Sequence, residues 1–197
     1  MTTAFLLDTC VISESALPRP RESVISFLQA TDNYFMPAGA LMELQMGITK
    51  VCSTNPIKAV KLSAWYHQLV RAGIPIVETD REVSETWGVL SADPRLQGLS
   101  QSGGRKKPRG GQDLHIAAAA LVRRLPIATM NVADFMLIHE CYPLPGIYDP
   151  LNDRWHARME PLADRYPLAA NNTRKEDEEM EQSAVRVSQV GTSSFRV

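Results

Sequence analysis

Short apolar runs of strand length alternate with helical patterns along the first 150 residues of this 197-residue chain. The first run, residues 4–7, has the continuous apolar character of a strand that is buried on both faces. Further strands are expected at residues 34–39, 74–79, 126–129 and 146–150, the last at the edge of the sheet. This order predicts an α/β fold in which a doubly wound, central parallel sheet is flanked by helices.

Several of the intervening helices carry signals that set their ends. The helix expected at residues 56–72 begins at Pro56, a favourable first-turn residue, and is stopped by Gly73. Asp80 is an N-cap for the next helix. An alanine-rich helix over residues 113–124 can pack closely on a sheet, and it ends in two arginines that suit the negative end of its dipole.

Two segments depart from the alternation. Residues 93–111 mix glycines with Arg and Lys side chains, which predicts a flexible basic loop. After residue 150 the apolar periodicity weakens, and the acidic run at 176–181 follows. The expected organisation is therefore a folded domain of residues 1–150 and a C-terminal extension of residues 151–197, which is disordered or binds a partner.

Composition narrows the class of protein. With 44% hydrophobic residues the chain can bury a sizeable core, and its net charge of −1 excludes a generally basic nucleic-acid binder. Three widely separated cysteines show no zinc-site spacing, which favours a reduced compartment. The apolar stretch at the N-terminus is too short for a signal peptide or a membrane span. We therefore expect a cytoplasmic protein that does not enter a membrane.

Four acidic residues occupy four separate short motifs, each close to the end of an expected strand or the start of an expected helix. In an open parallel sheet the carboxyl ends of the strands and the following helix starts face one edge, where sites of such folds lie. We therefore expect the four carboxylates to converge there and to require cations. The four residues are Asp8, Glu43, Asp113 and Asp134.

Each acid also has a structural interpretation. Asp8 suits a turn at a strand end, Asp113 suits a helix N-cap, and Asp134 suits the first turn of a helix, where the dipole favours an acid. Their occurrence together in this order favours a site. His115 is expected to be a packed or surface residue rather than a catalytic one. Other acids are expected to be solvated or to cap helices: Glu14, Glu78, Asp80 and Asp93.

The motifs LLDTCVISE, MELQMGI, QDLHIAAAA and TMNVADF, taken in this order, resemble the PIN domain of bacterial VapC-type toxins, including their FitB-like branch. The resemblance covers about residues 1–150. It implies a compact α/β nuclease, a hydrolase whose acidic pocket binds Mg²⁺ or Mn²⁺ and which cleaves RNA. It further implies inhibition by a small antitoxin and assembly as a homodimer.

The resemblance also implies roles for the acids. Asp8 and Asp113 are expected to bind the metal directly, because Mg²⁺ takes few direct carboxylates and keeps several waters. Glu43 and Asp134 would orient water or complete a second metal site. Thr129 matches a small hydroxyl residue at the edge of the site and is assigned to substrate binding.

The basic cluster within residues 93–111 could hold the phosphates that an acidic pocket repels. Its members are Arg105, Lys106, Lys107 and Arg109. This glycine- and arginine-rich insertion is longer than in similar domains. Cys10 stands where many have Asn, and we expect this difference to change the hydrogen bonds around Asp8. Met130 stands where many have Arg, which removes a cation.

Three further functions remain open. A PIN-like module could bind RNA or a protein without cleaving, although no carboxylate is missing. A stand-alone RNA-processing nuclease would have the same site without an antitoxin. A phosphatase with an aspartyl nucleophile is disfavoured, because such enzymes typically need a second Asp two positions after the first, where this chain has Cys10.

Overall fold

The computed structural model describes residues 3–100 and 112–159. Its strands form one sheet in the order β3-β2-β1-β4-β5-β6. The neighbouring strands from β3 to β5 pair in parallel, and β6 pairs with β5 antiparallel. The strands are β1 (Phe5–Leu7), β2 (Tyr34–Pro37), β3 (Ile76–Val77), β4 (Ile127–Ala128), β5 (Gly146–Asp149) and β6 (Arg154–Arg158).

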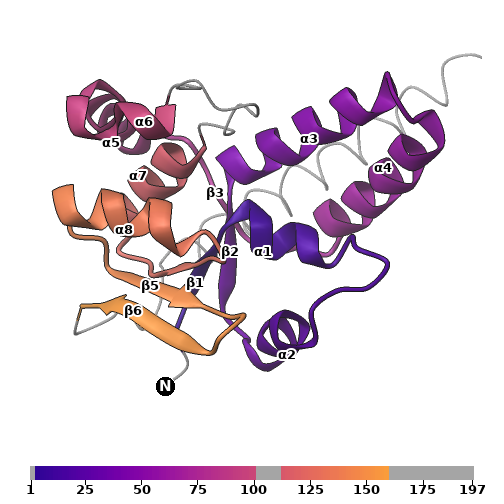
Figure 1. Ribbon diagram of the computed structural model, residues 1–197, viewed down its shortest axis with the longest axis horizontal. Coiled ribbons are helices and arrows are strands. Elements are labelled where there is room, and N and C mark those ends of the chain that lie inside the picture. Colours follow the sequence, from indigo (N-terminus) through magenta and orange to yellow (C-terminus); the bar gives the residue numbers. More distant parts are fainter. Residues whose placement is uncertain (1–2, 101–111, 160–197) are drawn as a thin grey trace, which may run out of the picture. The chain divides into compact units, whose positions relative to one another are not determined.

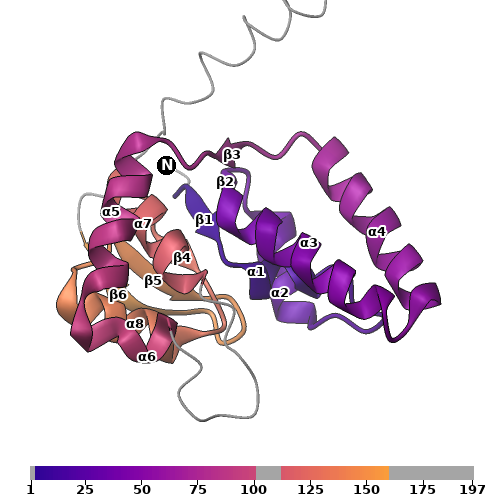
Figure 2. The same ribbon diagram turned by 90° about the horizontal axis from the view of Figure 1, so that it is seen from above.

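Helices cover both faces of this sheet. Figures 1 and 2 show α1 to α4 on one side and α5 to α8 on the other. The first group is α1 (Thr9–Glu14), α2 (Glu22–Ala30), α3 (Ala38–Cys52) and α4 (Pro56–Arg71). The second group is α5 (Arg81–Ala92), α6 (Gln97–Ser100), α7 (Asp113–Arg123) and α8 (Val132–Cys141), with a 3-10 turn, η1 (Pro94–Leu96), between α5 and α6. The predicted α/β class, with a mostly parallel sheet between helices, is confirmed.

The helix ends follow the expected chemistry. The carboxylate of Asp80 accepts a hydrogen bond from the Val83 amide at 3.0 Å, as an N-cap does. Asn55 caps α4 in the same way, by accepting from the Lys58 amide at 3.0 Å. Gly73, just after α4, has a φ of 70°, a conformation that glycine adopts without strain. The predicted stop of this helix at a glycine is therefore confirmed.

The alanine-rich helix α7 packs closely on its neighbours. Its four consecutive alanines, residues 117–120, are fully buried. Near its start, the ring of His115 lies against the backbone of α3, so that a Cβ added to Gly39 would stand only 2.3 Å from Nδ1 of His115. Only a glycine at position 39 allows the starts of α3 and α7 to approach this closely.

The structure corrects three expectations about the chain. Helix α1 was not expected, because it is short and directly follows the apolar run of β1. Residues 94–100 form helical turns rather than a flexible loop, whereas residues 101–111 lie outside the described residues. Strand β5 is not the edge strand, because β6 lies outside it.

Strand β6 also moves the expected end of the domain. The boundary placed after residue 150 falls inside the β5–β6 hairpin, so residues 154–158 belong to the sheet rather than to a disordered extension. Residues 160–197 lie outside the described part of the chain. Among the described helices, none is long and apolar enough to cross a membrane.

Candidate active site

A pocket of about 360 Å³ lies at the carboxyl ends of β1 and β4, at the edge of the sheet where the sequence predicted a site. The four acids selected from the sequence all contribute to its wall. Thr9, Cys10, Ser13 and Asn131 complete the lining. The acids that meet there are Asp8, Glu43, Asp113 and Asp134.

The topology explains this convergence. Asp8 follows β1 directly and occupies the N-cap position of α1. Glu43 lies in the second turn of α3, Asp113 is the first residue of α7, and Asp134 lies in the first turn of α8. Each acid therefore lies close to the start of a helix, and the helix starts meet at one edge of the sheet.

Asp8 is held on one side by two side-chain donors. The Thr129 hydroxyl donates to Oδ2 of Asp8 at 2.6 Å, and the Cys10 thiol donates to the same oxygen at 2.9 Å. Burial raises the pKa of Asp8, whereas these hydrogen bonds lower it and partly offset the effect of burial. Burial and the neighbouring charge of Asp8 also raise the pKa of the Cys10 thiol, so Cys10 remains a protonated donor. Cys10 therefore does contribute to the hydrogen bonding of Asp8.

Thr129 is completely buried, which leaves its side chain no surface for a substrate. Its hydroxyl oxygen also accepts a hydrogen bond from the backbone N–H of Asn131 at 2.8 Å. The backbone register explains why it reaches Asp8: Leu7 pairs with Ala128, so the residues that follow them lie side by side. Thr129 is placed to position Asp8 rather than to touch a substrate.

Asn131 joins the other two aspartates, a role that the sequence analysis did not assign. Its Nδ2 donates to Asp113 Oδ2 at 3.2 Å and to Asp134 Oδ2 at 2.9 Å. Asn131 occupies the N-cap position of α8 but makes no side-chain capping bond there. An amide three residues before a first-turn acid was the available signal, and it would ordinarily be read as a cap.

Glu43 completes the pocket from the helix α3 side and is half-buried. Burial raises its pKa, and the negative charge of Asp8 raises it further, whereas Lys50 lowers it. The carboxylates of Glu43 and Asp8 therefore repel each other, as expected for acids gathered without a cation.

The family model of the PIN domain matches residues 5–135. This chain belongs to the PIN domain family. The resemblance drawn from the four motifs is thereby confirmed. No curated protein matches the chain.

Solved structures share the fold of this PIN domain. One is FitAB bound to an IR36 DNA fragment, at 23% identity and a TM-score of 0.54, with 78% of this chain and 99% of that chain covered. A second is FitAcB from Neisseria gonorrhoeae, at 21% identity and 0.50, covering 74% and 97%. A third is VapBC2 from Rickettsia felis bound to a DNA fragment from their promoter, at 20% and 0.50, covering 68% and 92%. At these identities the similarity establishes the fold.

The carboxylate oxygens in the pocket of this PIN domain suit a hard divalent cation. Carboxylate oxygens are the ligands that Mg²⁺ prefers, and among the described residues that line the pocket none is Lys or Arg. Within residues 3–100 and 112–159, no three His, Cys, Asp or Glu side chains lie close enough together to hold a metal as they stand. A bound cation would therefore draw the carboxylates closer while relieving the repulsion between Asp8 and Glu43.

The charged side chain of Arg21 lies next to Met130, the position at which similar domains often carry Arg. The Arg21 guanidinium donates to the Met130 sulfur at 3.3 Å and to Glu14 Oε2 at 2.9 Å. Glu14 also accepts from the Arg21 amide at 2.6 Å. Glu14 was expected to be solvated or to cap a helix; its carboxylate is instead buried in this ion pair.

His115 lies outside the pocket lining. Its Nε2 is 2.7 Å from the Thr79 hydroxyl, and its ring meets Trp87 edge to face at 5.0 Å. Both contacts give it a packing role. The basic cluster of Arg105, Lys106, Lys107 and Arg109 lies outside the described residues.

Proposed function

We propose that this PIN domain is a Mg²⁺- or Mn²⁺-dependent endoribonuclease that acts as the toxin of a toxin–antitoxin pair. The observation that carries the proposal is the convergence of four carboxylates, from four separate elements, in one pocket whose described lining residues include no lysine or arginine. Membership of the PIN family supports a nuclease activity. The FitAB and VapBC structures, which share the fold, are toxin–antitoxin complexes and support the pairing.

The proposal gives each residue of the pocket a task. Asp8 and Asp113 bind the cation directly, Thr129 and Cys10 fix the orientation of Asp8, and Asn131 keeps Asp113 beside Asp134. A divalent cation in such a site lowers the pKa of bound water and stabilises negative charge on the phosphoryl oxygens. Glu43, whose pKa is raised by burial, would orient the attacking water beside the cation. Asp134 completes the water network or a second cation site.

The decisive experiment measures cleavage of single-stranded RNA by the purified full chain, with EDTA and after adding back Mg²⁺ or Mn²⁺. EDTA should abolish cleavage and either metal should restore it. Asp8→Asn and Asp113→Asn should each remove the activity while the circular dichroism spectrum stays that of the wild type. Asp32→Asn, at an exposed acid remote from the pocket lining, is the matched control. RNA binding without cleavage under all conditions would favour the non-cleaving module instead.

An antitoxin could inhibit this site through its own charge. An arginine from a small partner can pair bidentately with Asp8 or Asp113 and displace the cation. The large apolar side chains exposed on α3 are Met42 and Met46, whereas Leu44 and Ile48 on the same helix are buried. Methionine adapts to varied partners, which suits such a contact.

Co-expression with the neighbouring small reading frame tests this pairing. The complex should copurify and should not cleave RNA, and Met42→Lys should release the partner. A fully active protein that never copurifies with it would favour a stand-alone RNA-processing nuclease. Sedimentation of the purified chain tests the proposed homodimer.

A further inference from the structure

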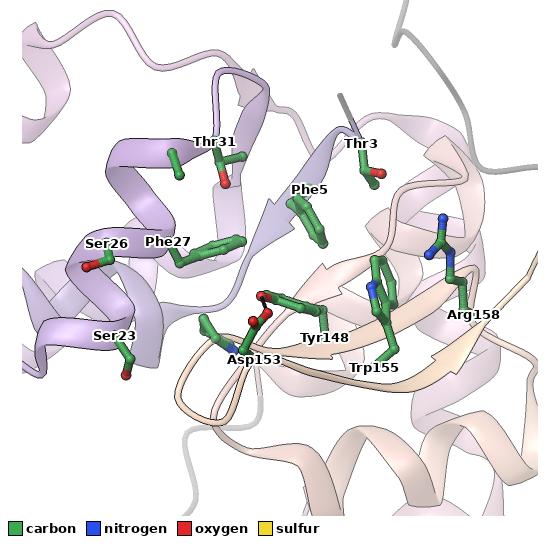
Figure 3. Close-up of a pocket in the computed structure, with 12 residues that line it drawn as sticks. Thr3, Phe5, Ser23, Ser26, Phe27, Thr31, Tyr148, Asp153, Trp155 and Arg158 are labelled. Atoms are coloured by element: carbon green, nitrogen blue, oxygen red, sulfur yellow. Dashed lines mark hydrogen bonds between the residues drawn. The ribbon is translucent and has the colours of Figure 1, made fainter. Parts of the chain in front are cut away.

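A second pocket, of about 630 Å³, lies between α2 and the β5–β6 hairpin (Figure 3). Four aromatic rings form its apolar surface. Phe5 lies 5.3 Å from Phe27, 5.3 Å from Tyr148 and 5.5 Å from Trp155 between ring centroids. Phe5 is buried, whereas the other three rings are only partly buried. The sheet therefore presents a continuous aromatic surface that no described helix covers completely.

A β-bulge gives this pocket its charged end. Trp155 and Arg158 are three residues apart, so in a regular strand they would point to opposite faces of the sheet. The pairing of β5 with β6 shifts between Ile147 and Tyr148, which leaves His156 as the extra residue. This shift turns both side chains to one face, where the Arg158 guanidinium lies 5.0 Å from the Trp155 ring.

Gly146 makes room for the tryptophan. A Cβ at this position would stand 2.8 Å from Cζ3 of Trp155 and 2.9 Å from Cβ of Pro126. The bulge and the glycine together hold the tryptophan in the pocket wall. Both features belong to the backbone of β5 and β6.

Polar groups lie around the rings in an asymmetric way. Figure 3 shows Asp153 and Arg158 at opposite ends of the row formed by Tyr148 and Trp155. Asp153 already accepts a hydrogen bond from the Tyr148 hydroxyl at 2.5 Å. Across the pocket, Ser23, Ser26 and Thr31 supply hydroxyl groups from α2 and its end. The pocket thus combines flat apolar rings with polar groups at its edge and a positive charge at one end, which favours a ligand that is flat, polar at its edges and negatively charged at one end.

We propose that this aromatic pocket binds a nucleotide of single-stranded RNA. The base packs against the exposed part of Trp155, with Tyr148, which is inclined by 56° to that ring, at the edge of the base, and the phosphate lies at Arg158. Asp153 and the α2 hydroxyls take hydrogen bonds at the base edge, away from the phosphate that Asp153 would repel. The inference rests on the proposed nuclease function, for which it supplies a site that holds the substrate away from the cleavage point.

The two pockets are close enough to share one strand of RNA. Phe5 and Asp8 lie at opposite ends of β1, three residues and roughly 10 Å apart. The Thr129 amide donates to the Tyr148 carbonyl at 2.9 Å, so the residue that holds Asp8 is itself bonded to a residue that lines the aromatic pocket. Sites for single strands cover roughly 4–16 nucleotides, which is a longer stretch of RNA than this separation requires.

Tryptophan fluorescence tests the inference. In the full chain carrying Trp65→Phe and Trp87→Phe, Trp155 is the remaining tryptophan and reports on its own pocket. A single-stranded RNA of roughly ten nucleotides should quench this signal saturably. The titrated protein also carries Asp113→Asn, and the buffer contains EDTA, so that binding is measured without cleavage. A pocket that binds RNA in a protein that never cleaves would refute the proposed nuclease function and leave this inference standing.

Three variants with the other tryptophans intact give the affinity by anisotropy. Trp155→Ala should weaken RNA binding roughly tenfold, and Trp155→Phe should restore most of it because a ring remains. Arg158→Gln, at an exposed residue, should weaken binding and reduce its salt dependence, even if Trp155→Ala fails to fold. AMP that competes for the quench shows that a free nucleotide suffices; AMP without effect shows that the strand is required, and both support the site.

Two results would overturn the inference. One is an RNA affinity that stays at the wild-type value in Trp155→Phe, Trp155→Ala and Arg158→Gln alike. The other is loss of self-association in these variants with RNA affinity unchanged, which would assign the aromatic surface to a second copy of the chain.

Discussion

The Thr129 hydroxyl donates a 2.6 Å hydrogen bond to Oδ2 of Asp8, at the ends of two adjacent parallel strands. The bond joins residues 121 positions apart in sequence. Because both partners are buried, the carboxylate keeps one orientation before any cation arrives. The site is therefore organised by the strands as well as by its acids.

Replacing Thr129 by valine should disturb the pocket without changing its volume much. Asp8 would lose a donor inside the protein, which should cost about 1–3 kcal/mol of unfolding free energy and raise the pKa of Asp8 further. RNA cleavage should fall with it. Urea unfolding and a cleavage assay measure both effects. Thr129→Ser, which keeps the hydroxyl, is the control, and equal losses in the two variants would show that the methyl group matters instead.

Asn131→Ala should loosen the pair of aspartates that share its amide. Asp113 and Asp134 would lose a common donor, so the metal-free protein should lose roughly 1–2 kcal/mol of stability. Added Mn²⁺ should recover part of this loss, because a cation can take the place of the donor. Thermal melts with and without Mn²⁺ measure this.

Asn152→Ala provides a matched control for Asn131. Its Nδ2 donates to Asp149 Oδ2 at 2.7 Å, outside the acidic pocket. This variant should lose similar stability but should gain no more from Mn²⁺ than the wild type does. An equal response to Mn²⁺ in both variants would separate Asn131 from metal binding.

Without metal, the protein should become less stable as the pH rises from acid toward neutral. Burial raises the pKa of Asp8 above 3.8 and that of Glu43 above 4.5. The folded chain therefore keeps protons that the unfolded chain releases, and this contribution to stability is full below about pH 4 and is lost as the pH passes through the raised values. Asp8→Asn should flatten the fall. Urea melts in EDTA across this range measure it, and an unchanged slope in the variant would contradict the assignment.

Two truncations should separate the sheet from the rest of the C-terminal region. A chain that ends at Met159 keeps β6 and should melt cooperatively. A chain that ends at Pro150 loses Trp155, which stacks on Phe5, and exposes β5 as an edge strand, so it should lose several kcal/mol or aggregate. Calorimetry compares the two. Equal melting temperatures would show that β6 adds nothing to the fold.

The sequence was sufficient to predict the sheet and the convergence of the acids, because both follow from general rules. Alternating strand and helix patterns imply parallel strands, and parallel strands bring their carboxyl ends to one edge. Asp8, Glu43, Asp113 and Asp134 could thus be selected from their positions alone. Their individual roles as ligands remain predictions.

What the sequence did not predict depends on register and side-chain direction. The hydroxyl of Thr129 reaches Asp8 because Leu7 pairs with Ala128, which no local pattern reveals. Asn131 stands where a helix cap would stand, but its side chain is directed to Asp113 and Asp134, which no local pattern reveals. Strand β6 escaped notice because its bulge breaks the two-residue alternation that identifies a strand.

The missing side chain at Gly39 has a consequence for how this site can change. Gly39 lies one helical turn before Glu43, and the ring it touches belongs to His115, two residues after Asp113. The contact therefore sets the spacing of the two helices that carry these carboxylates. A methyl group at position 39 would act as a wedge between the helices and separate the two acids. Mutational drift could thus disrupt this acidic pocket at a residue that has no functional group of its own.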